Sequence, residues 1–114
     1  MKFSESLKKS ADFKTVYRRG TSHADRNLVL YAYRNGQKRN HLGISASKKY
    51  GNSVERHRFQ RRIRAIYRLH EEAFHSGWDV VAVARSCARD ADYLSLEKSF
   101  LHLARKAHLL KTED

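Results

Sequence analysis

The sequence predicts a single α+β domain spanning residues 1–114, in the order helix, two or three strands, helix, strand, helix. Apolar residues alternate with a two-residue period in residues 27–34 and 41–47, and they form a continuous valine-rich run in residues 78–84. In three other segments they recur at steps of three and four residues, as on one face of a helix. A chain of 114 residues can build one core and fold as one domain.

The first helix is predicted to start at Ser10, whose side chain can cap it. Phe13, Val16 and Tyr17 then follow at the spacing of one helix face, and Gly20 supplies a stop. This helix therefore has an apolar face made largely of aromatic rings.

Two strands are predicted next, in residues 27–34 and 41–47, with a turn at the Asn-Gly pair of residues 35–36. We expect them to pair as antiparallel neighbours. The first strand places Leu28, Leu30 and Ala32 on one side and Val29, Tyr31 and Tyr33 on the other. Since both sides are apolar or aromatic, a second layer is needed to cover the tyrosines.

The second half of the chain predicts helix, strand, helix. Asn52 can cap a helix while Glu55 reaches back to it, and that helix continues to about residue 75, before Gly77. The run 78–84 suits a strand covered on both faces. Asp90 and Asp92 are expected to cap a last amphipathic helix that covers the sheet. Its apolar positions are Leu96, Phe100, Leu103, Ala107 and Leu110.

The net charge of +12, with a pI near 10.2, favours an anionic partner, and nucleic acid is the leading candidate. No segment approaches the roughly 20 apolar residues of a membrane-spanning helix. The N-terminus lacks the apolar stretch of a signal peptide. We therefore expect a cytoplasmic protein that does not act at a membrane.

The positive charge is concentrated in residues 48–68, where eight lysines and arginines face one acid. On a helical wheel, one sector holds Phe59, Ile63, Ile66 and Tyr67, and the opposite stripe holds His57, Arg61, Arg64 and Arg68. Arg58 and Arg62 form a second row beside that stripe. Arginine binds phosphate oxygens in pairs and stacks on bases, and like charges four residues apart oppose helix formation. The pattern therefore favours an RNA-binding surface over a solvated face.

A weaker signal comes from Phe13, Tyr17 and Tyr31, because basic residues such as Lys14 and Arg18 lie close to them in the sequence. Aromatic rings beside cations can stack unpaired bases. Core packing is the alternative, and the exposure of the three rings decides between the two.

Catalytic and metal-binding patterns are missing from the sequence. The one cysteine, Cys87, is expected to be a small buried hydrophobe, and the seven histidines lack a ligand spacing. We find no nucleophile motif, no phosphate-binding glycine loop and no persuasive acid pair. The sequence therefore predicts neither catalytic residues nor a metal site in the protein itself.

Residues 43–64, GISASKKYGNSVERHRFQRRIR, resemble the signature of the bacterial ribonuclease P protein family. The segments DFKTVYRRG at 12–20, LVLY at 28–31 and GWDVVAVAR at 77–85 are similar as well, so the resemblance covers nearly the whole chain. Arg56, Arg58, Arg61 and Arg64 match the family pattern directly. His57 stands where the family usually has Asn, and Gln60 where it usually has Lys.

The resemblance implies a two-layer α+β sandwich with a mixed four-stranded sheet and a left-handed β-α-β crossover. It also implies a subunit of an endoribonuclease that removes the 5′ leader of precursor tRNA, with the chemistry performed by an RNA subunit and Mg²⁺ held mainly by that RNA. No small-molecule cofactor is implied. The residues expected to bind the RNA subunit are Lys48, Lys49, Arg56, His57, Arg58, Arg61, Arg62, Arg64 and Arg68. Those expected to bind the leader are Phe13, Tyr17 and Tyr31.

Two other functions compete with this one. A ribosomal or ribosome-assembly protein that binds structured RNA, without supporting a reaction, fits the charge equally well. A DNA-reading helix needs Asn or Gln side chains that reach base edges, whereas this helix offers mainly arginine.

Overall fold

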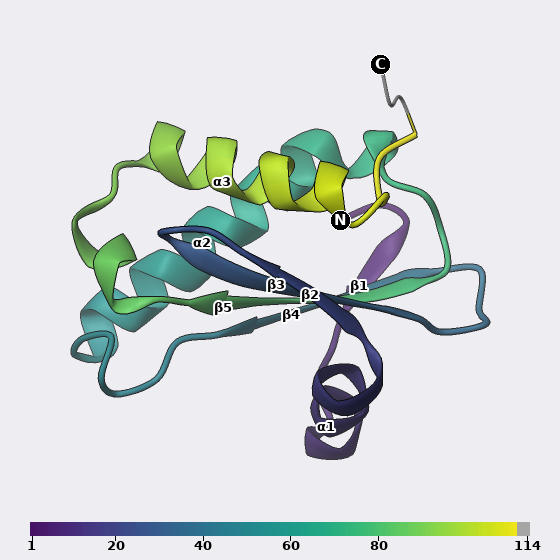
Figure 1. The fold of residues 1–114 in the computed structure, drawn as a ribbon, viewed down its shortest axis with the longest axis horizontal. Coiled ribbons are helices and arrows are strands. Elements are labelled where there is room, and N and C mark those ends of the chain that lie inside the picture. The colour runs from purple at the N-terminus through teal and green to yellow at the C-terminus, as the bar shows by residue number, and fades with distance from the viewer. Residues whose placement is uncertain (112–114) are drawn as a thin grey trace.

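The computed structural model describes residues 1–111 and contains a five-stranded sheet with three α-helices (Figure 1). The strands are β1 (Ser4–Ser6), β2 (Thr21–Ala24), β3 (Leu28–Arg34), β4 (Asn40–Ser45) and β5 (Trp78–Ala84). The helices are α1 (Ser10–Arg19), α2 (Ser53–His70) and α3 (Tyr93–Lys106), with short 3₁₀ turns η1 (Glu71–Ala73) and η2 (Ser86–Asp90). The predicted α+β sandwich is confirmed. None of the helices within residues 1–111 is long and apolar enough to cross a bilayer.

The sheet is mixed, in the order β1-β4-β5-β3-β2. β5 lies parallel to β4 and antiparallel to β3, so the predicted pairing of β3 with β4 is wrong. The apolar run of β5 explains the difference. Val80 and Ala82 are buried on one face of the sheet and Val81 on the other, so β5 needs a covering layer on each face, which the centre of the sheet provides.

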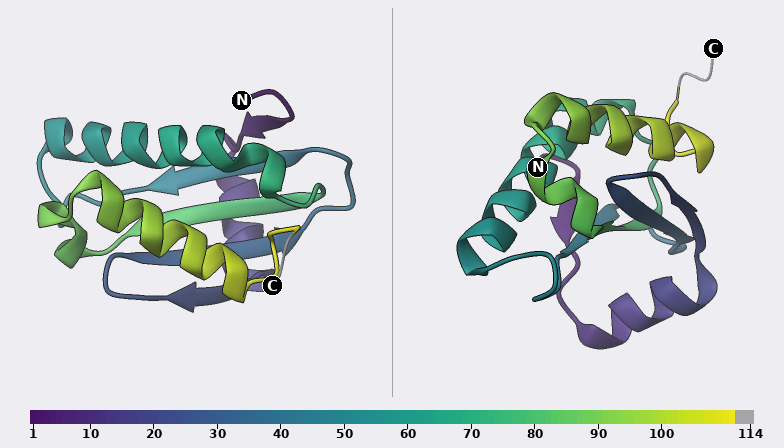
Figure 2. Two further views of the ribbon diagram at one scale, coloured as in Figure 1. Left: turned by 90° about the horizontal axis from the view of Figure 1, so that it is seen from above. Right: turned by 60° about the vertical axis from the view of Figure 1, so that its left-hand side comes forward.

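The connection from β4 through α2 to β5 is the left-handed crossover that the family resemblance implies. In the left panel of Figure 2 the helices face the viewer, and when β4 and β5 are turned to point upward, β5 lies to the left of β4. Crossovers between parallel strands are right-handed in about 98% of cases, so this connection is uncommon.

The sheet has five strands where the resemblance implied four, and β1 and β2 have no counterpart among the three strands predicted by residue range. β1 has the sequence SES and β2 has TSHA, and neither alternates in hydropathy. Both lie at the edges of the sheet, where backbone pairing and polar contacts hold them instead of apolar burial.

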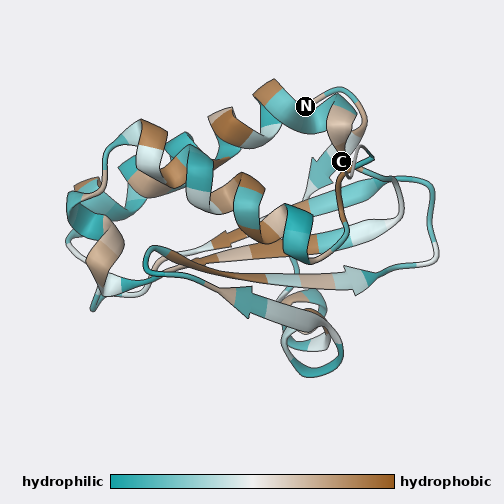
Figure 3. Cartoon of the chain, turned by 45° about the horizontal axis from the view of Figure 1, so that its top comes forward, coloured by the Kyte–Doolittle hydropathy of each residue, from teal (hydrophilic) through white to brown (hydrophobic). Residues whose placement is uncertain are grey.

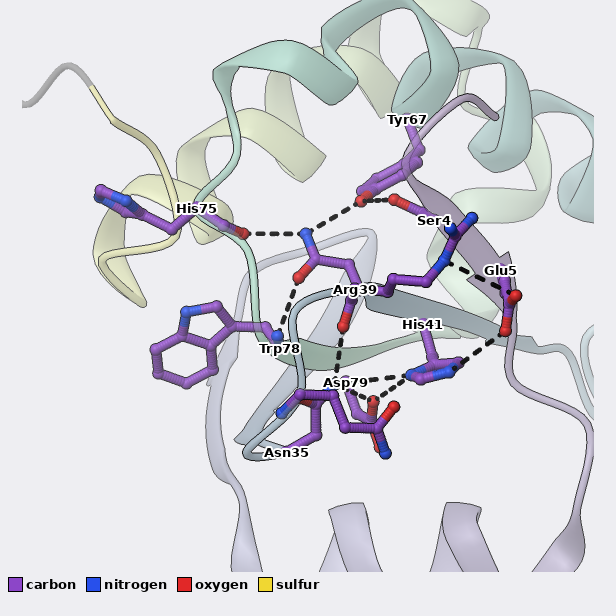
Figure 4. Close-up of polar contacts among 11 residues, drawn as sticks. Ser4, Glu5, Asn35, Arg39, His41, Tyr67, His75, Trp78 and Asp79 are labelled. Carbon is purple, nitrogen blue, oxygen red and sulfur yellow. Dashed lines mark hydrogen bonds and ion pairs between the residues drawn. The ribbon is translucent and has the colours of Figure 1, made fainter.

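Side chains anchor β1 at two points, shown in Figure 4. Ser4 Oγ shares a hydrogen bond of 2.7 Å with the hydroxyl of the buried Tyr67. On the other side of the strand, Glu5 lies 3.6 Å from Nε2 of His41, whose Nδ1 is 2.8 Å from Asp79 Oδ1. Contacts from α2, β4 and β5 therefore fix the edge strand.

Each face of the sheet carries its own apolar cluster. α2 and α3 cover one face, where the core includes Leu28, Leu30, Phe59, Ile63, Tyr67, Phe100 and Leu103. Figure 3 shows these two helices side by side over the sheet. α1 lies across the other face and buries Val16 against Val81 and Leu7 (Figure 1). The second layer required by the tyrosines of β3 is thus α1.

The helix ends are partly as predicted. Lys9, not Ser10, occupies the N-cap position of α1, and it makes no side-chain capping bond. Gly20 does end α1. A Cβ there would lie 2.6 Å from the Val16 carbonyl oxygen and 2.7 Å from that of Ala32, so the position requires glycine. Asp92 caps α3 by accepting from the Ser95 N–H at 2.8 Å. Asp90 lies in η2 and is not a cap.

α2 ends at His70 rather than near residue 75, because the chain tightens into η1. There the buried carboxylate of Glu71 accepts hydrogen bonds of 2.8 Å from the N–H groups of Lys2 and Phe3. Burial by itself raises the pKa of the Glu71 carboxyl, but hydrogen bonds from Lys2, Ser4 and Phe3 outweigh it, so the pKa is lowered. This carboxylate ties the N-terminus to the end of α2.

We expect Glu71→Gln to lower the free energy of unfolding by about 1–3 kcal/mol at pH 7, because the amide accepts less well from two N–H groups. The folded pKa lies below the ordinary value of 4.5, so the carboxylate contributes fully above that value. Its contribution is lost as the pH falls through the folded pKa. Urea unfolding between pH 7 and pH 3 measures both effects. Glu72→Gln, at an exposed neighbour, is the control, and an equal loss there would contradict this role.

Candidate nucleic-acid interface

The arginine-rich helix α2 begins at a complete capping box. Asn52 Oδ1 accepts from the Glu55 N–H at 2.9 Å, and Glu55 Oε1 accepts from the Asn52 N–H at 2.8 Å, as predicted. A Cβ at position 51 would overlap the Glu55 carboxylate, which explains the glycine before the cap. The box fixes where α2 starts and therefore which side chains face outward.

The predicted buried sector of α2 is confirmed, since Phe59, Ile63, Ile66 and Tyr67 are all buried. On the opposite stripe His57, Arg61 and Arg68 are exposed, and Arg64 is half-buried. In the second row Arg58 is exposed and Arg62 is half-buried. We call the stripe of His57, Arg61, Arg64 and Arg68 the α2 stripe. It makes no hydrogen bond or ion pair with any other side chain in residues 1–111.

Two of the predicted RNA-binding arginines also make hydrogen bonds to the protein backbone. Arg56 Nη1 donates to the Gly51 carbonyl at 2.8 Å, and Arg62 Nη1 donates to the Ala91 carbonyl at 3.2 Å. Each bond engages one nitrogen of a guanidinium group that has five N–H donors. Both groups therefore keep donors for a ligand but are less free to move than Arg61.

Lys48 and Lys49 are exposed in the loop between β4 and α2. The next residue, Tyr50, is buried, and its ring packs on Phe59 with centroids 5.4 Å apart. Burial raises the pKa of the Tyr50 hydroxyl, and the charges of Arg58 and Arg62 only partly counter this. Tyr50 thus anchors the basic loop, a role that the sequence reading missed because no periodic pattern surrounds it.

The basic surface also receives a contribution from η2 that the sequence did not indicate. Arg89 is exposed and its Nε lies 3.8 Å from Glu55 Oε2, beside the start of α2. Cys87, in the same turn, is exposed, so the prediction of a buried cysteine is wrong. The turn buries Ala88 instead, whose carbonyl accepts a long hydrogen bond of 3.4 Å from the Tyr50 hydroxyl.

The predicted aromatic residues do come together, on the sheet face opposite α2. The rings of Phe13 and Tyr17 lie 6.3 Å apart, and those of Tyr17 and Tyr31 lie 4.9 Å apart, edge to face. Tyr17 is 39% exposed, whereas Phe13 and Tyr31 are half-buried. We call these three rings the aromatic cluster. The exposure of Tyr17 leaves part of its ring surface accessible to a ligand.

Gly43 on β4 makes room for the aromatic cluster. A Cβ at this position would lie 2.7 Å from Cε1 and 2.8 Å from Cζ of Phe13. The glycine that opens the basic motif in the sequence is therefore required by a ring on the other face of the sheet from α2.

We expect Gly43→Ala to displace the Phe13 ring and to lower the free energy of unfolding by about 1–3 kcal/mol, the usual cost of overpacking. Urea unfolding of Gly43→Ala, Phe13→Leu and the double variant measures the coupling between the two positions. In the double variant the smaller, flexible leucine is expected to relieve part of the clash. Strictly additive losses would show that Phe13 does not limit the space at Gly43.

The two predicted sets of RNA-binding residues thus lie on different faces of the sheet, as the right panel of Figure 2 illustrates for α1 and α2. No group of three or more metal-binding side chains occurs within residues 1–111.

Comparisons with known proteins agree with the signature. Residues 1–108 match the family model described as Ribonuclease P. The chain is 43% identical over 111 residues to the ribonuclease P protein component of Lachnoclostridium phytofermentans, covering 97% of this chain and 96% of that protein. It is 43% identical over 102 residues to that of Clostridium botulinum strain Langeland, covering 89% and 92%.

Solved structures agree as well. The RNase P protein of Staphylococcus aureus superposes with a TM-score of 0.87 at 34% identity, covering 93% of this chain and 97% of that one. The RNase P protein of Thermotoga maritima superposes with a TM-score of 0.80 over 86% and 93% of the two chains. At 24% identity this second likeness supports the fold alone.

Proposed function

The chain belongs to the ribonuclease P protein family, and from that premise we propose which of its surfaces meets which RNA. As a protein subunit of ribonuclease P, it is an RNA-binding component of tRNA processing. Family membership favours this function over a ribosomal or ribosome-assembly role, which the net charge alone left open.

The α2 stripe binds the RNA subunit, together with Lys48, Lys49, Arg56, Arg58 and Arg62. The observation that carries this assignment is a row of outward cations on α2 that no carboxylate in residues 1–111 neutralises. The complete capping box and the buried sector fix the backbone of α2 before binding. Little backbone ordering then remains to oppose association.

The aromatic cluster receives the single-stranded 5′ leader of precursor tRNA. The exposed ring of Tyr17 supports this, since a base can stack on it whatever the leader sequence. Tyr17 shares α1 with exposed cations, among them Lys14 and Arg18, which can bind the leader phosphates.

The RNA subunit performs the hydrolysis, and Mg²⁺ is held mainly by RNA phosphates, where it can activate water and stabilise the leaving oxygen. The protein raises affinity for both RNAs by supplying cations and stacking surface. We expect this assembly to work in the cytoplasm.

Reconstitution tests the proposal. The protein is added to a bacterial ribonuclease P RNA and precursor tRNA at a Mg²⁺ concentration too low for the RNA alone. Cleavage at the 5′ end of the mature sequence is expected to be stimulated. A protein that binds the RNA but gives no stimulation would instead support the ribosome-assembly alternative.

A further inference from the structure

We propose that the surface for the RNA subunit continues from α2 onto α3, where Lys98, His102 and Arg105 contact a second stretch of RNA backbone. This inference rests on the proposed function of the α2 stripe. It adds a set of residues that neither the family signature nor the arginine-rich motif contains.

Lys98, His102 and Arg105 follow one another at steps of four and three residues, so they lie on one side of α3. We call them the α3 stripe. All three are exposed, and the buried positions Leu96, Phe100 and Leu103 occupy the opposite side of the helix. The α3 stripe therefore points away from the sheet, as the α2 stripe does.

No acid within residues 1–111 pairs with the α3 stripe. None of its three side chains makes a hydrogen bond or ion pair within residues 1–111. The acids nearest in sequence are otherwise engaged, because Glu97 Oε2 lies 2.8 Å from His70 Nε2 and Asp92 caps the helix. A solvated helix face normally mixes both signs of charge, whereas this one carries the cations Lys98 and Arg105 and no acid.

The two helices form one continuous surface. His70, the last residue of α2, lies 2.8 Å from Glu97 in the first half of α3, and Arg62 donates a hydrogen bond of 3.2 Å to the Ala91 carbonyl just before α3. Figures 2 and 3 both show the helices side by side on the same face of the sheet. The two stripes therefore belong to helices on the same face of the sheet, and an RNA that crosses both helices can meet both stripes.

The seam between the helices exposes apolar side chains. Leu69 is 67% exposed and lies on the flank of α2 that carries Arg62, seven residues before it. Leu94 is 63% exposed and lies on the flank of α3 that carries Glu97, three residues after it. Because Arg62 and Glu97 both contact the other helix, the two leucines border the seam. Apolar surface between two basic rows suits unpaired nucleotides. Their bases can pack on the leucines, and their phosphates can bind the neighbouring positive charges.

The dimensions also fit RNA. Arg105 lies seven positions after Lys98, which corresponds to about 10 Å along a helix at 1.5 Å per residue. Three nucleotides stacked at about 3.4 Å each have the same length. The α3 stripe can therefore contact two or three successive phosphates.

A salt titration tests the inference. We expect Lys98→Ala with Arg105→Ala to weaken binding of the protein to ribonuclease P RNA about tenfold, and the salt slope to fall by about two. The control pair is Lys38→Ala with Lys111→Ala, which removes the same charge. Both lysines are exposed and line a pocket near the start of β4. An equal loss of RNA affinity in both double variants would show that only the net charge matters, and it would overturn the proposal.

Directed cleavage gives an independent readout. Cys87 is the single cysteine and is exposed, so Cys87→Ser leaves a background without reactive thiols. In that background His102→Cys carries an iron chelate that generates hydroxyl radicals, and cleavage of the bound RNA near the tether is expected. Lys38→Cys is the control and is expected to give none. Absence of cleavage from position 102 would overturn the proposal.

The α2 stripe distinguishes failure of this inference from failure of the proposed function. If Arg61→Ala with Arg64→Ala weakens RNA binding but the α3 pair does not, the α3 surface is merely solvated. If neither pair weakens binding, the assignment of α2 to the RNA subunit is itself wrong.

Discussion

Replacing Arg61 and Arg64 together by alanine is expected to lower the affinity for ribonuclease P RNA about a hundredfold. A charge-assisted hydrogen bond contributes about 1.5–3 kcal/mol, and 1.4 kcal/mol corresponds to a factor of ten. Both guanidinium groups lie on the α2 stripe, and neither makes an internal bond within residues 1–111 that would have to be replaced. Filter binding over a series of KCl concentrations measures the affinity, and the salt slope should fall by about two.

The stability of this double variant should be nearly unchanged, because both side chains point away from the core. Thermal unfolding checks that point. Arg62→Ala is the informative comparison, since it also removes the bond to the Ala91 carbonyl and should lower stability as well as affinity. A salt slope that stays the same in the Arg61 and Arg64 variant would remove these residues from the RNA interface.

Tyr17→Ala is expected to weaken binding of precursor tRNA to the holoenzyme about five- to a hundredfold and to leave mature tRNA nearly unaffected. Stacking of one base on an aromatic ring contributes about 1–3 kcal/mol, and only the precursor carries a leader. Tyr17 is the most exposed ring of the aromatic cluster, and it rests edge-on against Tyr31. Affinities of the reconstituted holoenzyme for both tRNAs measure the effect.

Tyr17→Phe is the matched control, because it keeps the ring and removes only the hydroxyl. It should retain most of the affinity for precursor tRNA. Equal weakening of precursor and mature tRNA by Tyr17→Ala would indicate a structural role for the ring, acting through its contact with Tyr31.

The sequence predicted the parts of this fold that depend on local patterns. Asn52 and Glu55 located the start of α2, and the spacing of Phe59, Ile63 and Ile66 separated its buried side from its cationic side. These signals are reliable because capping and helical periodicity involve residues at most a few positions apart.

Features set by long-range contacts could not be predicted in the same way. The pairing of β3 with β5 joins residues about fifty positions apart, and a tight turn signal at residues 35–36 suggested the wrong neighbour. β1 and β2 are polar edge strands without periodicity. The close approach of Phe13 to Gly43 depends on how α1 crosses the sheet, which no single segment encodes.

The position of β5 at the centre of the sheet has a further consequence. One face of β5 packs against α2 and α3, and the other packs against α1. The thickness of a single sheet therefore separates the α2 stripe from the aromatic cluster. The sheet then acts as a rigid spacer that sets the distance between the RNA subunit and the leader. Because substitutions at distant sites without shared partners act independently, Tyr17→Ala should leave the affinity for ribonuclease P RNA unchanged.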